Sequence, residues 1–208
     1  METKKIAQKQ IDQIKKLYEK GLHININSGR GLYMLQEMFR EILPFTNLTY
    51  ENGSASWVKG KIYQHVNSFE YLKDVLMELQ KVKNKNIKGF EPKELIITLH
   101  CKDKVKEIED IVSNYPKLTT LWNGEAYDVL VKKIQTKAVG LHHLIELLNL
   151  KKKNVLVIGD NYNDAEMMAE GGISVTADKE RVKGDFYVEI DGDKLPADRL
   201  MEKLLELI

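Results

Sequence analysis

The N-terminal part of the chain combines an amphipathic helix with a strand of alternating polarity. Apolar side chains recur at helical spacing from Ile6 to Glu19, and lysines occupy the other face. Residues 22–27, Leu-His-Ile-Asn-Ile-Asn, alternate between apolar and polar as a strand does. A second helix is predicted from Tyr33 to Leu43, and a short strand follows at residues 48–50. This order of elements favours an α/β fold.

The same alternation returns after Thr136 and continues to the end of the chain. The predicted helices are Lys137–Leu148, Ala165–Ala169 and Leu195–Leu207, and the predicted strands are residues 154–158, 172–176 and 186–190. Strands that alternate with helices pair in parallel. We therefore expect one α/β core with a parallel sheet, built from both ends of the chain.

The middle of the chain has a different order of predicted helices and strands. A hairpin is predicted around Lys59-Gly60, and a helix over residues 69–82. Lysine and asparagine dominate residues 83–91, which predicts an exposed loop. The elements predicted after it are a strand at 95–100, a helix at 105–112 and strands at 118–122 and 127–132. This order is typical of an α+β module, so we expect a core of residues 1–53 and 119–208 interrupted by an α+β cap at 54–118.

Composition narrows the class of protein further. The 208 residues contain 32 basic and 31 acidic side chains, a balance that gives no reason to expect nucleic acid or an anionic membrane as partner. The single cysteine, Cys101, excludes an internal disulfide and fits a reducing compartment. The sequence after Met1 lacks the apolar stretch of a signal peptide, and no apolar run is as long as a membrane span. We therefore predict a soluble, cytoplasmic protein.

The strongest candidate for chemistry follows the predicted strand at 154–158. Its apolar residues lead through Gly159 into Asp160, Asn161, Tyr162, Asn163 and Asp164. In open α/β sheets, ligands bind at the carboxyl ends of strands, and carboxylate oxygens suit Mg²⁺. The alternative is an Asx turn in which Asp160 or Asn163 caps the next helix. Two carboxylates and two carboxamides within six positions are more than capping needs.

Two further segments carry polar groups at the end of a strand or the start of a helix. Ser28, Gly29 and the helix after Arg30 offer a hydroxyl and unpaired amides, which together suit a phosphate; the alternative is that Ser28 simply caps that helix. Lys137 opens a helix, where the helix dipole disfavours a cation, and an anion bound there would offset this cost. The alternative for Lys137 is an ordinary solvated surface lysine.

These segments, in this order, resemble the haloacid dehalogenase superfamily of phosphatases, and more closely its Cof-type and sucrose-phosphatase-like sugar phosphatases. The matching segments are Asn27 to Arg30 for the second motif, Lys137 for the third, Gly159 to Asp164 for the fourth, Glu51-Asn52-Gly53 before the cap, and residues 170–175 and 182–185 in the tail. The resemblance begins at Lys4 and covers the rest of the chain. It implies a Rossmannoid parallel-sheet core with an inserted C2-type cap.

The resemblance also implies a function and roles for single residues. The family activity is Mg²⁺-dependent hydrolysis of a small phosphomonoester, here a sugar phosphate, through an aspartyl-phosphate. Asp160 would bind the Mg²⁺ and Asp164 would support the metal or its water shell. The residues implied to contact the substrate are Ser28, Gly29, Arg30, Asn52, Lys137 and Asn163, with Ser28 and Lys137 holding the transferring phosphoryl group.

One departure from the family is large. The first motif, an apolar strand that ends in Asp-x-Asp-Gly and carries the nucleophile, is absent, and Lys4 to Ile6 align with residues that directly follow it. Asp191 and Asp193 follow an apolar strand, but near the end of the chain and in the wrong topological place. The missing strand would lie between the strands that begin near Leu22 and Val155, so these two either pair directly or leave a gap.

Several alternatives follow from this departure. We expect a truncated N-terminus, with genuine degeneration as the alternative, and the DNA upstream of Met1 discriminates between them. The chain as written is expected not to turn over a generic aryl phosphate. A non-catalytic phosphosugar- or protein-binding module is the alternative function, and a phosphomutase is a third. An exposed strand edge would promote a homo-oligomer.

Overall fold

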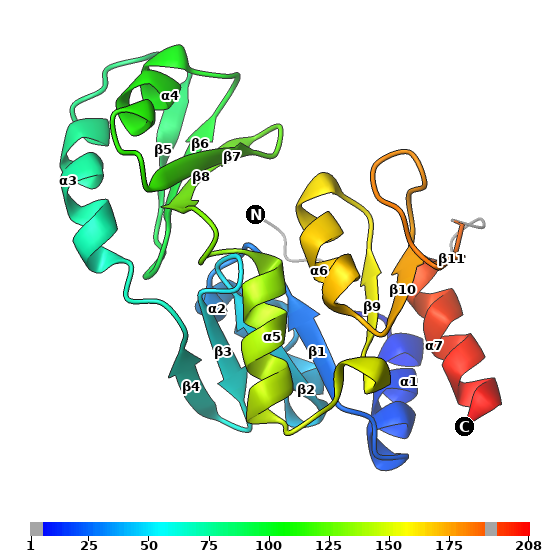
Figure 1. Ribbon diagram of the computed structural model, residues 1–208. Helices are drawn as coiled ribbons and strands as arrows, with labels where there is room; N and C mark the ends of the chain where they lie inside the picture. The colour runs from blue at the N-terminus through cyan, green and yellow to red at the C-terminus, as the bar shows by residue number, and fades with distance from the viewer. Residues whose placement is uncertain (1–5, 190–194) are drawn as a thin grey trace. The chain divides into compact units, whose positions relative to one another are not determined.

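The computed structural model describes residues 6–189 and 195–208, and the chain divides into two compact units (Figure 1). The first unit comprises Met1–Tyr63 and Thr136–Ile208, and the second comprises Gln64–Gln135. These boundaries differ from the predicted cap at 54–118 because the pairing of the strands assigns segments at both ends of the cap to other sheets. The hairpin around Lys59 extends the sheet of the first unit, and the strands around Leu118 and Tyr127 complete the sheet of the second.

One sheet of the first unit has the strand order β1-β2-β3-β4. Its strands are β1 (Ile24–Asn27), β2 (Thr46–Tyr50), β3 (Ala55–Val58) and β4 (Lys61–Gln64). β1 runs parallel to β2, with Asn27 opposite Thr49, and β3 runs antiparallel to β2. All five residues of β2 are buried, so β2 is the centre of this half of the core.

The predicted helix over 33–43 divides into two shorter pieces between β1 and β2. These are α2 (Leu32–Met38) and the 3-10 helix η1 (Arg40–Phe45), which contains Pro44. The missing N–H of proline and its clash with the preceding turn disfavour a continuous α-helix there.

A second, fully parallel sheet has the order β11-β10-β9. Its strands are β9 (Leu156–Gly159), β10 (Ile173–Thr176) and β11 (Phe186–Tyr187). Among the described residues, β1 pairs only with β2 and β9 only with β10. The predicted α/β core with parallel strands is confirmed, but it consists of two sheets. Of the two outcomes expected for β1 and β9, direct pairing does not occur between their described residues.

Helices join the two sheets. The helices of the first unit, besides α2, are α1 (Gln8–Glu19), α5 (Lys137–Leu147), α6 (Ala165–Glu170) and α7 (Pro196–Leu207), and short 3-10 helices η2 (Lys152–Asn154) and η3 (Tyr162–Asp164) flank β9. α5 contacts β1, β2 and β3, α6 contacts β9 and β10, and α5 and α6 pack against each other (Figure 1). α1 packs against α7. The pair of α5 and α6 therefore ties the β1 sheet to the β9 sheet.

The second unit is an antiparallel sheet of order β5-β6-β8-β7 with helices α3 (Phe69–Leu79) and α4 (Lys106–Ser113). The strands are β5 (Ile87–Glu91), β6 (Ile97–Cys101), β7 (Leu118–Trp122) and β8 (Ala126–Val131). Cys101 is buried in its core, as expected of a packing residue, and this burial raises the pKa of its thiol.

β5 corrects one prediction, because it occupies the segment interpreted as a loop. Its residues alternate between half-buried and exposed, so Lys88 and Phe90 face outward while Ile87 packs on the core. As the edge strand it pairs on one side only, and the register shifts at Gly89. A short edge strand with charged, outward side chains has a weak apolar pattern, which is why composition alone suggested a loop.

No helix among the described residues is both long and apolar enough to cross a membrane. Asp191 and Asp193, the Asp-x-Asp pair near the end of the sequence, lie outside the described residues.

Candidate functional site

The end of β1, the start of α5 and the end of β9 are joined by side-chain hydrogen bonds. Asn27, the last residue of β1, donates from Nδ2 to the carbonyl oxygen of Lys137 at 2.9 Å. Lys137 donates from Nζ to Oδ1 of Asp164 at 2.6 Å. The three segments that the sequence singled out separately therefore belong to one site.

The ion pair between Lys137 and Asp164 is largely withdrawn from water. Their side chains are 14% and 4% exposed. Oδ2 of Asp164 accepts the backbone N–H groups of Asp160 and Asn161, each at 3.2 Å. A buried pair is tolerable only when further hydrogen bonds satisfy its charges, as they do here. Lys137 is thus not the solvated surface lysine of the alternative interpretation, and Asp164 holds its ammonium at the start of α5.

Asp160 and Asn163 differ from Asp164 in that both are exposed. Neither caps a helix. Asn161 accepts from the N–H of Tyr162 at the start of η3, and the N-cap position of α6 is Asp164, whose side chain makes no capping hydrogen bond to that helix. The capping interpretation therefore does not account for Asp160 and Asn163. Gly159 makes the tight turn possible, because a Cβ there would lie 2.6 Å from Cβ of Asp164.

Ser28 does not cap a helix either, since the N-cap of α2 is Gly31. Its Oγ accepts the N–H of Arg30 at 3.2 Å, and its own N–H donates to the carbonyl of Thr49. Ser28 and Gly29 are half-buried, and the Arg30 side chain is exposed. The hydroxyl proton of Ser28 remains a donor that the turn does not use.

The turn at Glu51, Asn52 and Gly53 supports the loop after β1. The N–H of Asn52 donates to the carbonyl of Ser28 at 3.1 Å, and the N–H of Glu51 donates to that of Arg30 at 3.0 Å. Asn52 is only 2% exposed. This geometry makes Asn52 a support of the loop, and its predicted contact with a substrate stays a prediction.

The sequence alone assigns no separate role to the Asn27 side chain. Its Nδ2 bonds Lys137 and also lies 3.3 Å from Sδ of Met167, and its Oδ1 is buried with no hydrogen-bond partner among the described residues. Buried polar atoms are nearly always paired, so this acceptor marks a place for a donor from a ligand or water. The sequence feature that could have indicated a role for Asn27 is its position, because it is a polar residue at the end of a strand whose apolar positions are isoleucines.

The carboxylates fit a magnesium ion only in part. Both oxygens of Asp164 already accept hydrogen bonds, whereas the exposed Asp160 carboxylate is available. Within residues 6–189 and 195–208, no three His, Cys, Asp or Glu side chains are grouped to hold a metal ion. Because Mg²⁺ is usually held by one or two carboxylates together with phosphate oxygens and water, these residues suit a Mg²⁺ shared with a bound phosphate.

A curated protein is similar to a short part of this chain. A protein of Streptococcus pyogenes, named as a bifunctional phosphatase/peptidyl-prolyl cis-trans isomerase, is 39% identical over 54 residues, which are 26% of this chain and 11% of that protein. The chain thus spans about a tenth of the length of that curated relative.

Solved structures resemble the whole fold. A hypothetical protein from Geobacillus kaustophilus superposes with a TM-score of 0.76 at 22% identity, covering 100% of this chain and 94% of that one. BT1666 of Bacteroides thetaiotaomicron, analysed among phosphatases of the haloalkanoate enzyme superfamily, gives 0.74 at 18% identity, covering 97% and 88%. At these identities the likeness establishes the fold.

The family itself is established by sequence. The profile of the haloacid dehalogenase-like hydrolases matches residues 1–84 and 73–180, a span that contains Ser28, Lys137 and Asp164. The resemblance to the haloacid dehalogenase superfamily is therefore confirmed. Because this match includes the hydrogen-bonded site and both sides of the inserted unit, the chain belongs to the haloacid dehalogenase-like hydrolase family.

Proposed function

We propose that this site binds the phosphoryl group of a small phosphomonoester, of the sugar-phosphate class, together with Mg²⁺. The observation that carries the proposal is the buried Lys137–Asp164 pair at the start of α5. Lys137 has three N–H donors, and Asp164 is its one partner among the described side chains. Its remaining donors, the Ser28 hydroxyl and the unpaired amides of the helix start all favour an anion.

Each residue has a distinct part in this proposal. Lys137 and Ser28 donate to the phosphoryl oxygens, while Asn27 and Asp164 position Lys137. Asn163 contacts the phosphate or orients Lys137. Asp160 would hold Mg²⁺, which when bound neutralises charge on the phosphoryl oxygens. Positioning and charge neutralisation are most of what phosphoryl transfer requires of a protein.

Hydrolysis in the family proceeds by attack of an aspartate on phosphorus, and the sequence offers no matching Asp-x-Asp before Ser28. We therefore propose that the chain of 208 residues binds the phosphoryl group without turning it over. The alternative, a non-catalytic phosphosugar- or protein-binding module, predicts the same behaviour. Extending the chain with the in-frame upstream codons separates the two, because only the phosphatase gains turnover.

Calorimetric titration with inorganic phosphate in the presence of Mg²⁺ tests the binding proposal. We expect Lys137→Ala to weaken phosphate binding by about tenfold or more. The control Lys151→Ala, an exposed lysine before η2, should bind as the parent does. Equal binding by the parent and Lys137→Ala would remove the basis of the proposal.

Assays with p-nitrophenyl phosphate and Mg²⁺ test the lack of turnover. We expect no hydrolysis above the buffer blank. Robust hydrolysis that Asp160→Ala abolishes would show that the chain contains a working nucleophile.

A further inference from the structure

The strand β4 is the end strand of the four-stranded sheet in the first unit, and all four of its residues are exposed. Its two large apolar side chains lie on opposite faces, because successive residues of a strand alternate. Ile62 is 59% exposed and Tyr63 is 37% exposed. Among the described residues, β4 pairs only with β3, so its outer edge has no strand neighbour (Figure 1). β4 therefore presents apolar surface on both faces beside an open edge.

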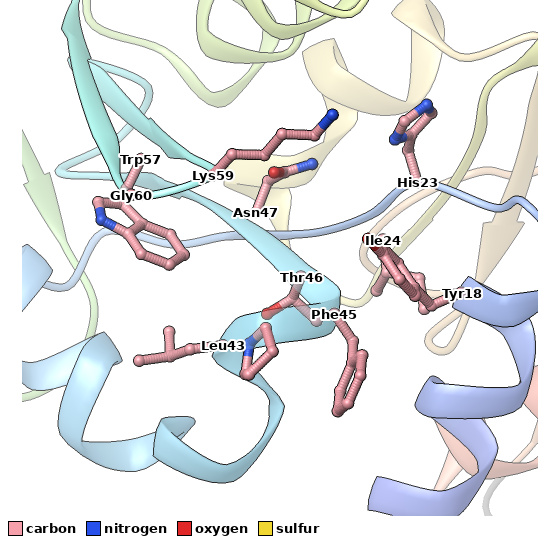
Figure 2. A pocket seen from close by; sticks show the side chains of 11 residues that line it. Tyr18, His23, Ile24, Leu43, Phe45, Thr46, Asn47, Trp57, Lys59 and Gly60 are labelled. Atoms are coloured by element: carbon pink, nitrogen blue, oxygen red, sulfur yellow. The ribbon is translucent and has the colours of Figure 1, made fainter.

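The turn before β4 determines which of its backbone groups point outward. Lys59 and Gly60 join β3 to β4 (Figure 2), and their φ values of +49° and +82° make this a type I′ turn. In a two-residue hairpin, the residues that flank the turn, here Val58 and Lys61, form a hydrogen-bonded pair. Such pairs alternate along an antiparallel ladder, so the N–H and C=O of Ile62 point away from β3.

Ile62 also continues an apolar row across the sheet. The same turn places Ile62 opposite Trp57 of β3, and Trp57 is opposite Leu48 of β2. Opposite residues share a face, so these three side chains lie side by side. Their exposure increases outward, from 0% for Leu48 through half-buried Trp57 to 59% for Ile62. An edge that stays unpaired usually carries a charge or a proline at its outermost position, whereas this row ends in an isoleucine.

A second copy of β4 fits this edge. Only another strand covers both faces of an edge at once, because its own side chains alternate above and below the sheet. When two copies pair antiparallel about a two-fold axis at Ile62, the outward N–H of each Ile62 donates to the C=O of the other. Lys61 of each copy then lies opposite Tyr63 of the other, so no like charges meet. An axis at Gln64, the other outward residue, would pair β4 with residues beyond its end.

We propose that β4 joins two copies of this chain into a symmetric dimer in which the two four-stranded sheets become one. The apolar rows that end at Ile62 meet at the axis. On the other face, the Lys61 ammonium of one copy lies against the Tyr63 ring of the other, a favourable contact between a cation and an aromatic ring. A contact between two short strands is much smaller than a standard interface, so we expect a dissociation constant on the order of 100 µM.

Sedimentation equilibrium of the full chain, from about 10 µM to about 1 mM, tests this association. We expect a monomer–dimer equilibrium. Ile62→Asp places two like charges opposite each other at the axis and should weaken the dimer by at least about tenfold. Met77→Asp is the matched control, because Met77 of α3 is equally exposed, at 59%, and lies outside this edge. It should leave the dissociation constant unchanged.

Two substitutions at Tyr63 test the register of the paired strands. Tyr63→Glu places a carboxylate opposite Lys61 of the second copy, and the symmetry makes this pair occur twice. We expect this variant to tighten the dimer by about fivefold. Tyr63→Lys places like charges opposite each other and should weaken the dimer by about fivefold. An association driven only by exposed apolar surface would instead be weakened by both substitutions.

The proposal is overturned if the parent remains a monomer at about 1 mM, if Met77→Asp weakens the dimer as much as Ile62→Asp does, or if both Tyr63 substitutions weaken it. A dimer that Ile62→Asp leaves intact would place the contact elsewhere, such as at the edges of β1 and β9, and would also overturn it. The proposed function is tested by phosphate binding at Lys137, so a monomeric parent would leave that proposal unaffected.

Discussion

The position of the Lys137 side chain is determined by the residues around it. A cation at the first position of a helix faces the positive end of the helix dipole, and Asp164 offsets that cost at 2.6 Å. Asp164 in turn accepts the amides of Asp160 and Asn161, so one buried carboxylate orders both the lysine and the loop after β9. The loss of either partner leaves a charge in a place that water barely reaches.

Replacing Lys137 with methionine should therefore lower stability. We expect the free energy of unfolding in urea to fall by about 3 kcal/mol, because the Asp164 carboxylate stays buried without its counter-charge. The control Lys203→Met breaks an exposed pair with Glu206, whose side chains are 65% and 66% exposed. It should cost less than about 1 kcal/mol. Equal losses in the two variants would mean that the Lys137 pair is solvated.

Tyr127 makes the second unit sensitive to alkaline pH. Burial of its phenol, joined by a hydrogen bond to Glu109, raises its pKa from 10.0 to about 12. The folded state thus holds this proton more tightly than the unfolded chain does. Its contribution to stability is complete below about pH 10 and is lost as the pH rises toward 12.

We expect the difference in unfolding free energy between the parent and Tyr127→Phe to shrink from pH 10 to 12, since phenylalanine cannot ionise. Urea unfolding at a series of pH values measures it. A pH-independent difference for Tyr127→Phe would contradict the shifted pKa.

The contact between the Glu51–Gly53 turn and α5 depends on two glycines. A Cβ on Gly53 would lie 2.1 Å from the carbonyl oxygen of Thr136, and a Cβ on Gly140 would lie 2.5 Å from Cα of Gly53. The turn that supports the Ser28 loop therefore lies directly against the first turn of α5.

Gly60 is a matched control for Gly53, because their φ values are +82° and +83° and only Gly53 is crowded. We expect Gly60→Ala to cost about 1 kcal/mol from backbone strain. Gly53→Ala should cost about 1–3 kcal/mol more from overpacking, as measured by thermal or urea unfolding. Similar losses in the two variants would show that the turn can move away from α5.

β1 and β9 each have one strand neighbour among the described residues. In a parallel pair, alternate residues of a strand bond to each side. Every second amide of β1 and β9 should therefore exchange rapidly in hydrogen-exchange NMR. Leu48 and Thr49 of β2 and Val175 and Thr176 of β10, which have strand neighbours on both sides, should be protected. Uniform protection of β1 and β9 would mean that another strand covers these edges.

The two units are each built around their own buried cluster. The second unit has four antiparallel strands, two helices and a core that includes Leu99, Tyr127 and Val129. Its strands pair only with one another among the described residues. A sheet with three or more strands and a helix layer has what independent stability requires.

We therefore expect residues 64–135, expressed alone, to fold with dispersed NMR signals and a cooperative urea transition. Leu99→Ala, at a position with no exposure, should lower the stability of this fragment by about 3 kcal/mol. Leu121→Ala, at a position that is 38% exposed, should lower it far less. An isolated fragment without a cooperative transition would show that the unit depends on the rest of the chain.

Local pattern predicted most elements and the members of the site, but not their boundaries or partners. Two elements were predicted correctly because their patterns depend only on residues that are close in the sequence. They are the strand before Gly159, with its apolar run, and the helix Lys137–Leu147, with its helical spacing. β5 was missed because an edge strand buries only one narrow face. The limits of the inserted unit differ from the predicted ones because strand pairing decides to which sheet a hairpin belongs. Strand pairing joins segments that are distant in the sequence.

The sequence by itself determined the α/β class, the interruption by an α+β unit and the family, because these rest on periodicity and on short motifs. Only the tertiary structure decided that Lys137 is paired and buried, that Asp164 is occupied while Asp160 is available, and that β1 and β9 belong to separate sheets. Each of these facts depends on distances between residues far apart in the chain, such as Lys137 and Asp164. Whether a charge is paired, a side chain is buried or a strand has a neighbour depends on which distant segments come together in the fold. The residue pattern within one segment does not contain that information.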